Sequence, residues 1–260
     1  LPEAQRKGRF DQIALGSVSG GRFSLRVSHN VHGSVSGAGM SCGNSCEVTL
    51  DYQSVVTLTA NADSGYAFAG WAGACSGTGG CTVMLDAAKT VTAVFGQQLS
   101  GANPNGSGTL SALVTGGGNG QWAYTATGTG YLDTAGFIPS TGHPKSPPEA
   151  LPAGYSFPYG LFDFVLTGGE AGSSATVTVT YPAALPAGTV FWKYGPTADN
   201  TNPHWYSLPS AVIAGNQITF TIQDGGLGDD DLAANGTIVD QGGPGVPITS
   251  VPLLPPLGLL

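Results

Sequence analysis

Strict alternation of apolar residues with threonine or serine is the feature of this sequence that most constrains its fold. The pattern recurs in "EVTLDYQSVVTLTA", "KTVTAVF", "SATVTVTYP" and "NQITFTI". A period of two places successive side chains on opposite faces of a strand, and valine and threonine favour strands. Only "SALVTGG" and "DDDLAANG" resemble short helical turns. The sequence therefore predicts an all-β protein.

Turn-rich stretches divide the 260 residues into segments, and a chain of this length accommodates two domains. We expect a small β repeat domain at 24–96 and an antiparallel β-sandwich at 109–241. A linker rich in Gly, Asn and Ser is expected between them at 97–108. Extended segments are expected at both ends, polar and basic at 1–23 and apolar and proline-rich at 242–260.

Charged residues are scarce, at 9% of the chain. The formal net charge is −8, which excludes a nucleic-acid partner, because phosphate binding requires a positive surface. Low charge with abundant glycine and Ser/Thr is typical of exported all-β proteins. No apolar run reaches the ~20 residues of a membrane helix. The chain begins with Leu, and we expect that a signal peptide has been removed.

The four cysteines form two close pairs, Cys42/Cys46 and Cys75/Cys81. In a chain of exported composition, such pairs predict disulfides. The alternative is a zinc site that also uses His29 and His32, but this spacing fits no standard zinc module well.

An aspartate-rich stretch, "DGGLGDDDLAANGTIVD", occupies residues 224–240. Calcium prefers several carboxylate and carbonyl oxygens on a flexible loop, and clustered carboxylates need a compensating cation. The alternative is a solvated turn in which aspartates cap backbone amides. Catalysis is not expected, because no second carboxylate cluster or catalytic motif accompanies the loop. The expected calcium ligands are Asp224, Asp229, Asp230, Asp231, Asn235 and Asp240.

Two aromatic pairs, in "FWKYGP" and "NPHWYSLP", lie close together in the second domain. Exposed rings of this kind stack on sugars, whereas buried rings fill a sandwich core, which is the interpretation we favour. The residues are Trp192, Tyr194, Trp205 and Tyr206.

The C-terminal stretch "VPITSVPLLPPLGLL" is too apolar to be left in water, and its prolines favour extended geometry. It either folds back on its own sheet or adds as a strand to a neighbouring molecule. Because the start of the chain is basic and its end acidic, we expect head-to-tail contact between copies. The expected assembly residues are Val246, Ile248, Val251, Leu253, Leu254 and Leu257.

The first domain resembles an internalin-type B-repeat. The resemblance rests on "SLRVSHNVHGSVSGAGMSCGNSC" and "SVVTLTANADSGYAFAGWAGACSGTGGCTVMLDAAKTVTAVF". It implies a small all-β or β-grasp-like module of bacterial surface proteins that is not a catalytic unit.

The second domain resembles the choice-of-anchor U domain of exported bacterial proteins. The matching residues are "FPYGLFDFVLTG", "ATVTVTYPAALPAGTVFWKYGPTADNTNPHWYSLP" and "ITFTIQDGGLGDDDLAANGTIVDQGGPGVP". In that family a C-terminal sorting segment follows, and "VPLLPPLGLL" is similar to its start. The resemblance implies membrane contact only through an anchor that is missing or cleaved here.

These features together predict a non-enzymatic, extracellular structural protein of a bacterial cell surface. We expect a self-assembling fibre or sheath subunit whose partner is another copy of itself, joined through its terminal segments. The alternative is an adhesin or carbohydrate-binding module that binds a surface glycan. A secreted hydrolase would need a cleft with two converging carboxylates, and the sequence shows no such pair.

Overall fold

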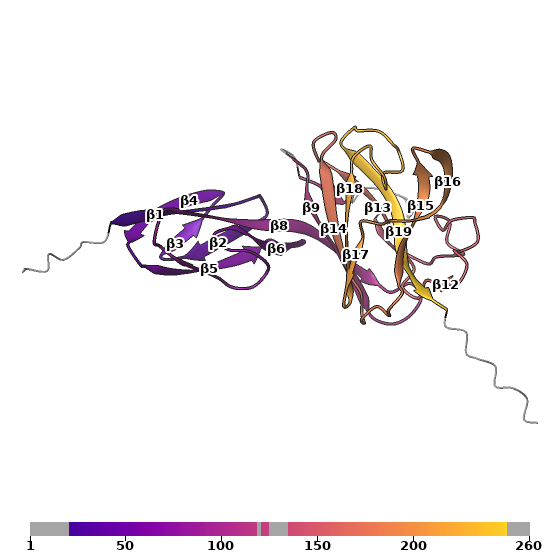
Figure 1. Cartoon of the computed structure of the whole chain (residues 1–260), viewed down its shortest axis with the longest axis horizontal. Helices are drawn as coiled ribbons and strands as arrows, with labels where there is room; N and C mark the ends of the chain where they lie inside the picture. Colours follow the sequence, from indigo (N-terminus) through magenta and orange to yellow (C-terminus); the bar gives the residue numbers. More distant parts are fainter. Residues whose placement is uncertain (1–20, 119–120, 125–134, 249–260) are drawn as a thin grey trace, which may run out of the picture.

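The computed structural model describes residues 21–118, 121–124 and 135–248. Within these ranges the chain contains strands and turns but no helix, which confirms the all-β prediction. The strands form two domains that lie end to end, with the described chain entering at one end and leaving at the other (Figure 1). Over the same ranges, no helical segment has the length and apolar character needed to cross a membrane.

The first domain packs two small sheets face to face. One contains β4, β1, β8 and β6, and the other has the order β3-β2-β5-β7. Its core includes Leu25, Val27, Trp71 and Phe95, which lie on the inward phase of the alternating strands. The strands are β1 (Arg22–His29), β2 (Gly33–Gly37), β3 (Met40–Cys42), β4 (Ser45–Asp51), β5 (Val55–Ala62), β6 (Tyr66–Gly73), β7 (Cys81–Met84) and β8 (Lys89–Ala102).

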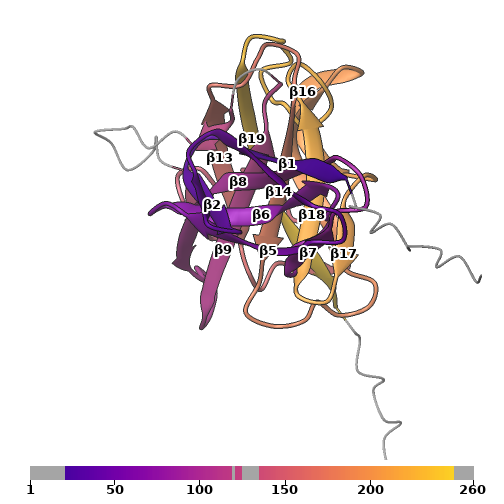
Figure 2. The same ribbon diagram turned by 90° about the vertical axis from the view of Figure 1, so that its left-hand side faces the viewer.

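The second domain is a sandwich of two antiparallel sheets. One sheet continues from β8 in the order β8-β9-β14-β18-β17, and the other has the order β10-β13-β19-β15-β16, with β11 on β13 and β12 on β19. Figure 1 shows the two layers side by side, and Figure 2 views the molecule from the side of the first domain. The strands are β9 (Thr109–Gly116), β10 (Ala123–Tyr124), β11 (Gly136–Ile138), β12 (Tyr155–Ser156), β13 (Leu161–Thr167), β14 (Ser174–Thr180), β15 (Val190–Thr197), β16 (Asn200–Ser207), β17 (Val212–Ala214), β18 (Gln217–Gln223) and β19 (Thr237–Pro247).

Strand β8 belongs to both domains. Its first half pairs with β1 and β6, and its second half, from Gln97 to Ala102, pairs with β9. The stretch 97–108, expected to be a linker, is therefore half strand and half turn. The composition of this stretch predicted a linker. However, the backbone N–H and C=O groups of residues 97–102 pair with β9, and polar residues and glycine can form such a ladder as well as apolar residues.

The expected C-terminal segment at 242–260 likewise begins inside a strand. Residues 242–247 complete β19, and Gly242, Gly243, Pro244 and Gly245 are buried. Pro244 pairs with Phe191 of β15, whereas the ladder with β13 ends at Gly242. Proline is tolerated there because no β13 residue requires its missing N–H.

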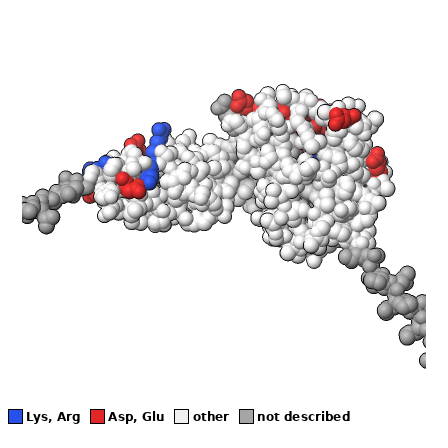
Figure 3. All heavy atoms as spheres, viewed as in Figure 1, with Lys and Arg blue, Asp and Glu red and all other residues white. Residues whose placement is uncertain are grey.

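Charged side chains are unevenly distributed on the molecule. On the face shown in Figure 3 they lie at the outer end of the first domain and along one edge of the second. The surface around the junction of the domains is uncharged in this view.

Candidate functional site

The aspartate-rich loop that precedes and enters β19 holds its own backbone in place. Asp224 Oδ2 accepts hydrogen bonds from the backbone N–H groups of Gly172 and Gly236, at 2.7 and 2.8 Å. Asp229 accepts one from Gly225 at 2.8 Å and one from Val239 at 3.0 Å. These side chains are 2% and 0% exposed. Both buried carboxylates therefore accept backbone N–H groups of the loop and of its neighbouring turn and strand.

The exposed part of the loop uses its oxygens in the same way. Asp231 accepts hydrogen bonds from the Ala233 N–H at 2.8 Å and from the Asn235 side-chain amide at 3.0 Å. Asn235 Oδ1 in turn accepts the Thr237 N–H at 2.8 Å. Each of the two Asp231 carboxylate oxygens, and the Asn235 amide oxygen, thus accepts a hydrogen bond from a different N–H group.

Among the residues that the structure describes, no three His, Cys, Asp or Glu side chains are grouped to hold a metal ion. The hydrogen bonds of Asp224, Asp229 and Asp231 are those that the capping interpretation expects, and the calcium interpretation stays a prediction. The loop differs from a solvated turn in one respect, because Asp224, Asp229 and Asp240 are buried.

Asp240, at the end of this stretch, forms a buried ion pair with Lys193. Lys193 Nζ lies 2.5 Å from Asp240 Oδ1, and both side chains are 1% exposed. The ammonium also donates to the Gly228 carbonyl at 3.3 Å and lies 5.2 Å from the centre of the Phe220 ring. Lys193 was not among the predicted site residues, although it lies two residues after Phe191 and so shares its inward phase.

A hollow of about 340 Å³ opens beside this ion pair. Three carboxyl groups reach it, those of Asp163, Asp230 and Asp240. Asp163 is paired with Lys145 at 2.5 Å and accepts a hydrogen bond from Gln241 at 3.1 Å. The hollow is also lined by Tyr194, Gly195, Pro196, Pro203, Val239 and Gln241.

Burial changes the proton affinity of two of these acids. It raises the pKa of Asp230 to about 8, with a further contribution from the Asp240 charge. It also raises the pKa of Asp240 to about 6, against the opposing effect of Lys193. Asp163 forms an ion pair with Lys145, and Asp240 forms one with Lys193. These ion pairs form a charge network that joins the loop to β13 and β15.

The four predicted aromatic residues of β15 and β16, Trp192, Tyr194, Trp205 and Tyr206, are half-buried and do not form an exposed row. Trp192 and Trp205 pack against the small cluster of Ile138, Phe157 and Leu161. Tyr194 and Trp205 meet edge to face, with ring centres 5.3 Å apart. This packing agrees with the core interpretation and gives no support to a sugar-stacking face.

Tyr206 lies on the face of the β15–β16 hairpin opposite to Trp205, and it is the residue of β16 that pairs with Lys193 of β15. Its hydroxyl is buried near the acidic loop, and burial with the nearby aspartates raises its pKa. It therefore belongs to the polar network and not to the aromatic cluster.

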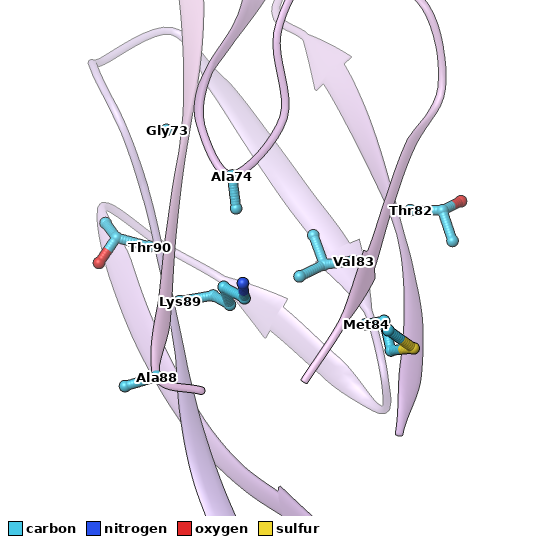
Figure 4. A pocket seen from close by; sticks show the side chains of 8 residues that line it. All are labelled: Gly73, Ala74, Thr82, Val83, Met84, Ala88, Lys89 and Thr90. Atoms are coloured by element: carbon cyan, nitrogen blue, oxygen red, sulfur yellow. The ribbon is translucent and has the colours of Figure 1, made fainter. Parts of the chain in front are cut away.

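Another hollow, of about 380 Å³, lies on the first domain between β7 and β8 (Figure 4). Its lining is mostly Gly, Ala and Thr, with Lys89 and Val83 pointing towards its centre. Lys89 is engaged with Asp86 at 2.6 Å. These residues supply no pair of reactive groups.

Both predicted disulfides are present, Cys42–Cys46 and Cys75–Cys81. The histidines of the zinc alternative are elsewhere engaged. His29 bonds to the Asn30 carbonyl, and His32 stacks on Tyr66 with ring centres 3.9 Å apart.

Only the first two residues of the expected assembly segment are described. Val246 lies in β19 and pairs with Ser156, and the Ile248 N–H donates to the Gly154 carbonyl at 2.8 Å. The Ile248 side chain is 61% exposed. Val251, Leu253, Leu254 and Leu257 lie outside the described residues.

Comparison with known proteins bears on the first domain. No curated protein and no solved structure matched the chain. Residues 23–99 match the family model described as the divergent InlB B-repeat domain. The match extends three residues beyond Gly96, into the part of β8 that the second domain shares. The first domain is thus similar to the divergent InlB B-repeat domain, a family that suggests a bacterial surface protein.

Proposed function

We propose that this protein is a non-enzymatic structural component of the bacterial cell surface, in which two β domains form one rigid spacer. The observation that carries the proposal is the sharing of β8. Gln97 pairs with Tyr66 of the first domain and with Val114 of the second. Domains within a chain usually meet through flexible linkers and move relative to each other, whereas bending here would break a β-ladder.

The close approach of strands at the junction supports this rigidity. A side chain on Gly96 would meet the Val114 carbonyl and the Thr115 side chain. Gln97 Oε1 accepts the Tyr124 N–H at 2.6 Å, which ties β8 to the opposite sheet as well. The junction is therefore packed from several sides.

The surface location draws on the B-repeat match and on the disulfides, which are compatible with an oxidising environment. The family-model match covers the first domain alone. The expected resemblance of the second domain to choice-of-anchor U proteins rests on its sequence motifs, and from it we propose a C-terminal attachment to the cell envelope. The described chain enters and leaves at opposite ends, which suits a spacer (Figure 1).

Assembly into a fibre or sheath is the finer part of the proposal. Both domains have sheet edges, such as β4, β16 and β17, to which an extended segment of another copy could add. Head-to-tail addition without closure would produce filaments.

The proposal is tested first by locating the native protein on cells with antibody labelling and surface proteolysis. Labelling at the cell surface is expected, and a protein confined to the cytosol would overturn the proposal. Small-angle X-ray scattering then compares the wild type with a variant carrying a six-residue Gly-Ser insertion between Gly96 and Gln97. The wild type should show one elongated shape and the insertion variant a broader distribution.

Negative-stain microscopy of the native material tests assembly separately. Filaments or sheets support the fibre proposal. Dispersed single particles on a surface-located protein would remove the assembly step and leave the spacer.

A further inference from the structure

Strands β1 and β8 are parallel neighbours at the centre of the first domain's larger sheet. Their register runs from Leu25 opposite Lys89 to His29 opposite Ala93. The described chain enters β1 at Arg22, and β8 leaves the first domain at its C-terminal end, where it continues into the second domain. Because the strands are parallel, these two attachment points lie at opposite ends of the pair.

This placement determines how a pull along the chain would load the domain. Tension between the two ends draws β1 and β8 in opposite directions along their own lengths. All the hydrogen bonds of the pair then carry the load together. Strand β4, by contrast, is antiparallel to β1 and places Asp51 opposite Arg22, so a pull between those two residues would open that pair one bond at a time.

A side chain extends the β1–β8 ladder beyond the last backbone pair. The Asn30 amide donates to the Phe95 carbonyl at 2.6 Å, and its oxygen accepts the Phe95 N–H at 2.7 Å. Asn30 therefore takes the place of a strand residue between the His29–Ala93 pair and the first β9 pair at Gln97. It occupies the point at which tension would enter the first domain from the second.

The side chains beneath the pair oppose sliding. Leu25, Val27, Val91 and Phe95 are fully buried. A side chain on Gly33 would collide with the Phe95 ring, so β2 closes tightly over this residue. A slip of one residue would also turn the buried face of β8 outwards.

We propose that β1 and β8, latched by Asn30, form a mechanical clamp that resists tension along the chain axis. The need for such a clamp rests on the proposed surface function, but its resistance to force does not. Both disulfides lie outside the clamped strands, in residues 42–46 and 75–81, so they limit extension only after the clamp has opened.

Single-molecule force spectroscopy of the full chain tests the clamp in two pulling directions. In one, handles are attached at the two chain ends, and in the other they are attached at positions 22 and 51. The protein and its stability are the same in both, so only the direction of load differs. We expect a clearly higher unfolding force for the first domain in the end-to-end direction. Equal forces, or a lower end-to-end force, would overturn the clamp.

Substitutions separate the latch from general stability. Asn30→Ala should lower the end-to-end unfolding force and leave the force between positions 22 and 51 almost unchanged. The control is Thr57→Ala, which removes an exposed 3.3 Å contact with Thr82 in the other sheet and should change neither force. Equal loss in both directions for Asn30→Ala would show that Asn30 stabilises the domain without latching it.

The two pulling directions in the wild type decide the clamp even if Asn30→Ala prevents folding. The outcome is also independent of the surface proposal. A weak first domain on a surface-located protein would reject the clamp alone, and a strong clamp in a cytosolic protein would reject the surface function alone.

Discussion

The Lys193 ammonium lies 2.5 Å from the Asp240 carboxylate in the interior of the second domain, where each side chain is 1% exposed. An ion pair removed from water to this extent is costly to form and more costly to break on one side. The pair joins β15 to β19, and β19 lies between β13 and β15 in its sheet. The pair therefore links β15 directly to β19 within the interior of the domain.

Removing the cation of the pair should be strongly destabilising. Lys193→Met leaves the buried Asp240 carboxylate uncompensated and is expected to lower the free energy of unfolding by about 3–5 kcal/mol. Urea denaturation of the second domain measures the loss. The double variant Lys193→Met with Asp240→Leu should recover much of it, because an apolar pair needs no compensation. A double variant no more stable than Lys193→Met alone would contradict this account.

The acidic hollow should make the second domain more stable at mildly acidic pH. The pKa of Asp230 is raised to about 8 and that of Asp240 to about 6, against 3.8 for an ordinary aspartate. Between about pH 4 and 8 the folded state therefore binds more protons than the unfolded chain, so stability falls as the pH rises. Denaturation at several pH values checks the direction. Asp230→Asn should flatten the profile, and Asp231→Asn, which alters an exposed carboxylate, should leave it unchanged.

The two buried carboxylates that cap the aspartate-rich loop should matter more than the exposed one. Asp224→Ala and Asp229→Ala each leave two backbone N–H groups without their acceptor, a loss of about 2–4 kcal/mol. Asp231→Ala should have the smaller effect of an exposed cap, about 1 kcal/mol. Thermal unfolding followed by circular dichroism measures each loss.

The same loop gives a prediction for metal removal. Because Asp224 Oδ2 and both carboxylate oxygens of Asp229 and Asp231 already accept protein N–H groups, adding a calcium chelator should leave the melting temperature unchanged. A fall in melting temperature with the chelator, reversed by calcium, would instead restore the calcium interpretation of these aspartates.

The junction between the domains should tolerate no side chain at Gly96. Gly96→Val places atoms against the Val114 carbonyl, and we expect a loss of about 1–3 kcal/mol with a less rigid junction. Small-angle X-ray scattering and urea denaturation measure the two effects. Ser100→Val, at an exposed position of the same strand, is the control and should retain the wild-type shape.

Local features of the fold could be predicted from the sequence because the period of two fixes which side chains face inwards. Val177 and Val179 are buried as the alternation requires. The intervening Thr178 faces Thr219 across the strand pair, with their hydroxyls 3.0 Å apart. The disulfides could be predicted because each pair is close in sequence.

Features that join distant residues could not be predicted in this way. Lys193 and Asp240 come from different strands, and the bond between Asn30 and Phe95 spans 65 positions. Such partners are set by sheet topology, on which local periodicity carries no information. The continuation of β8 through residues 97–102 could not be predicted for the same reason, because these residues form a strand only by pairing with β9.

The shared strand also limits how this protein can be rearranged by recombination. Val91, Ala93 and Phe95 face the first core, and Leu99, in the same odd-numbered phase, packs against the second. Successive side chains of a strand point to opposite faces, so deleting one residue between Phe95 and Leu99 would turn the side chains of one half of β8 away from their core. The two domains therefore depend on the same alternation of buried and exposed residues along β8. A recombination event that replaces the second domain would therefore have to join the two sequences after β8, in the turn at 103–108. The whole of β8 would then be inherited together with the first domain.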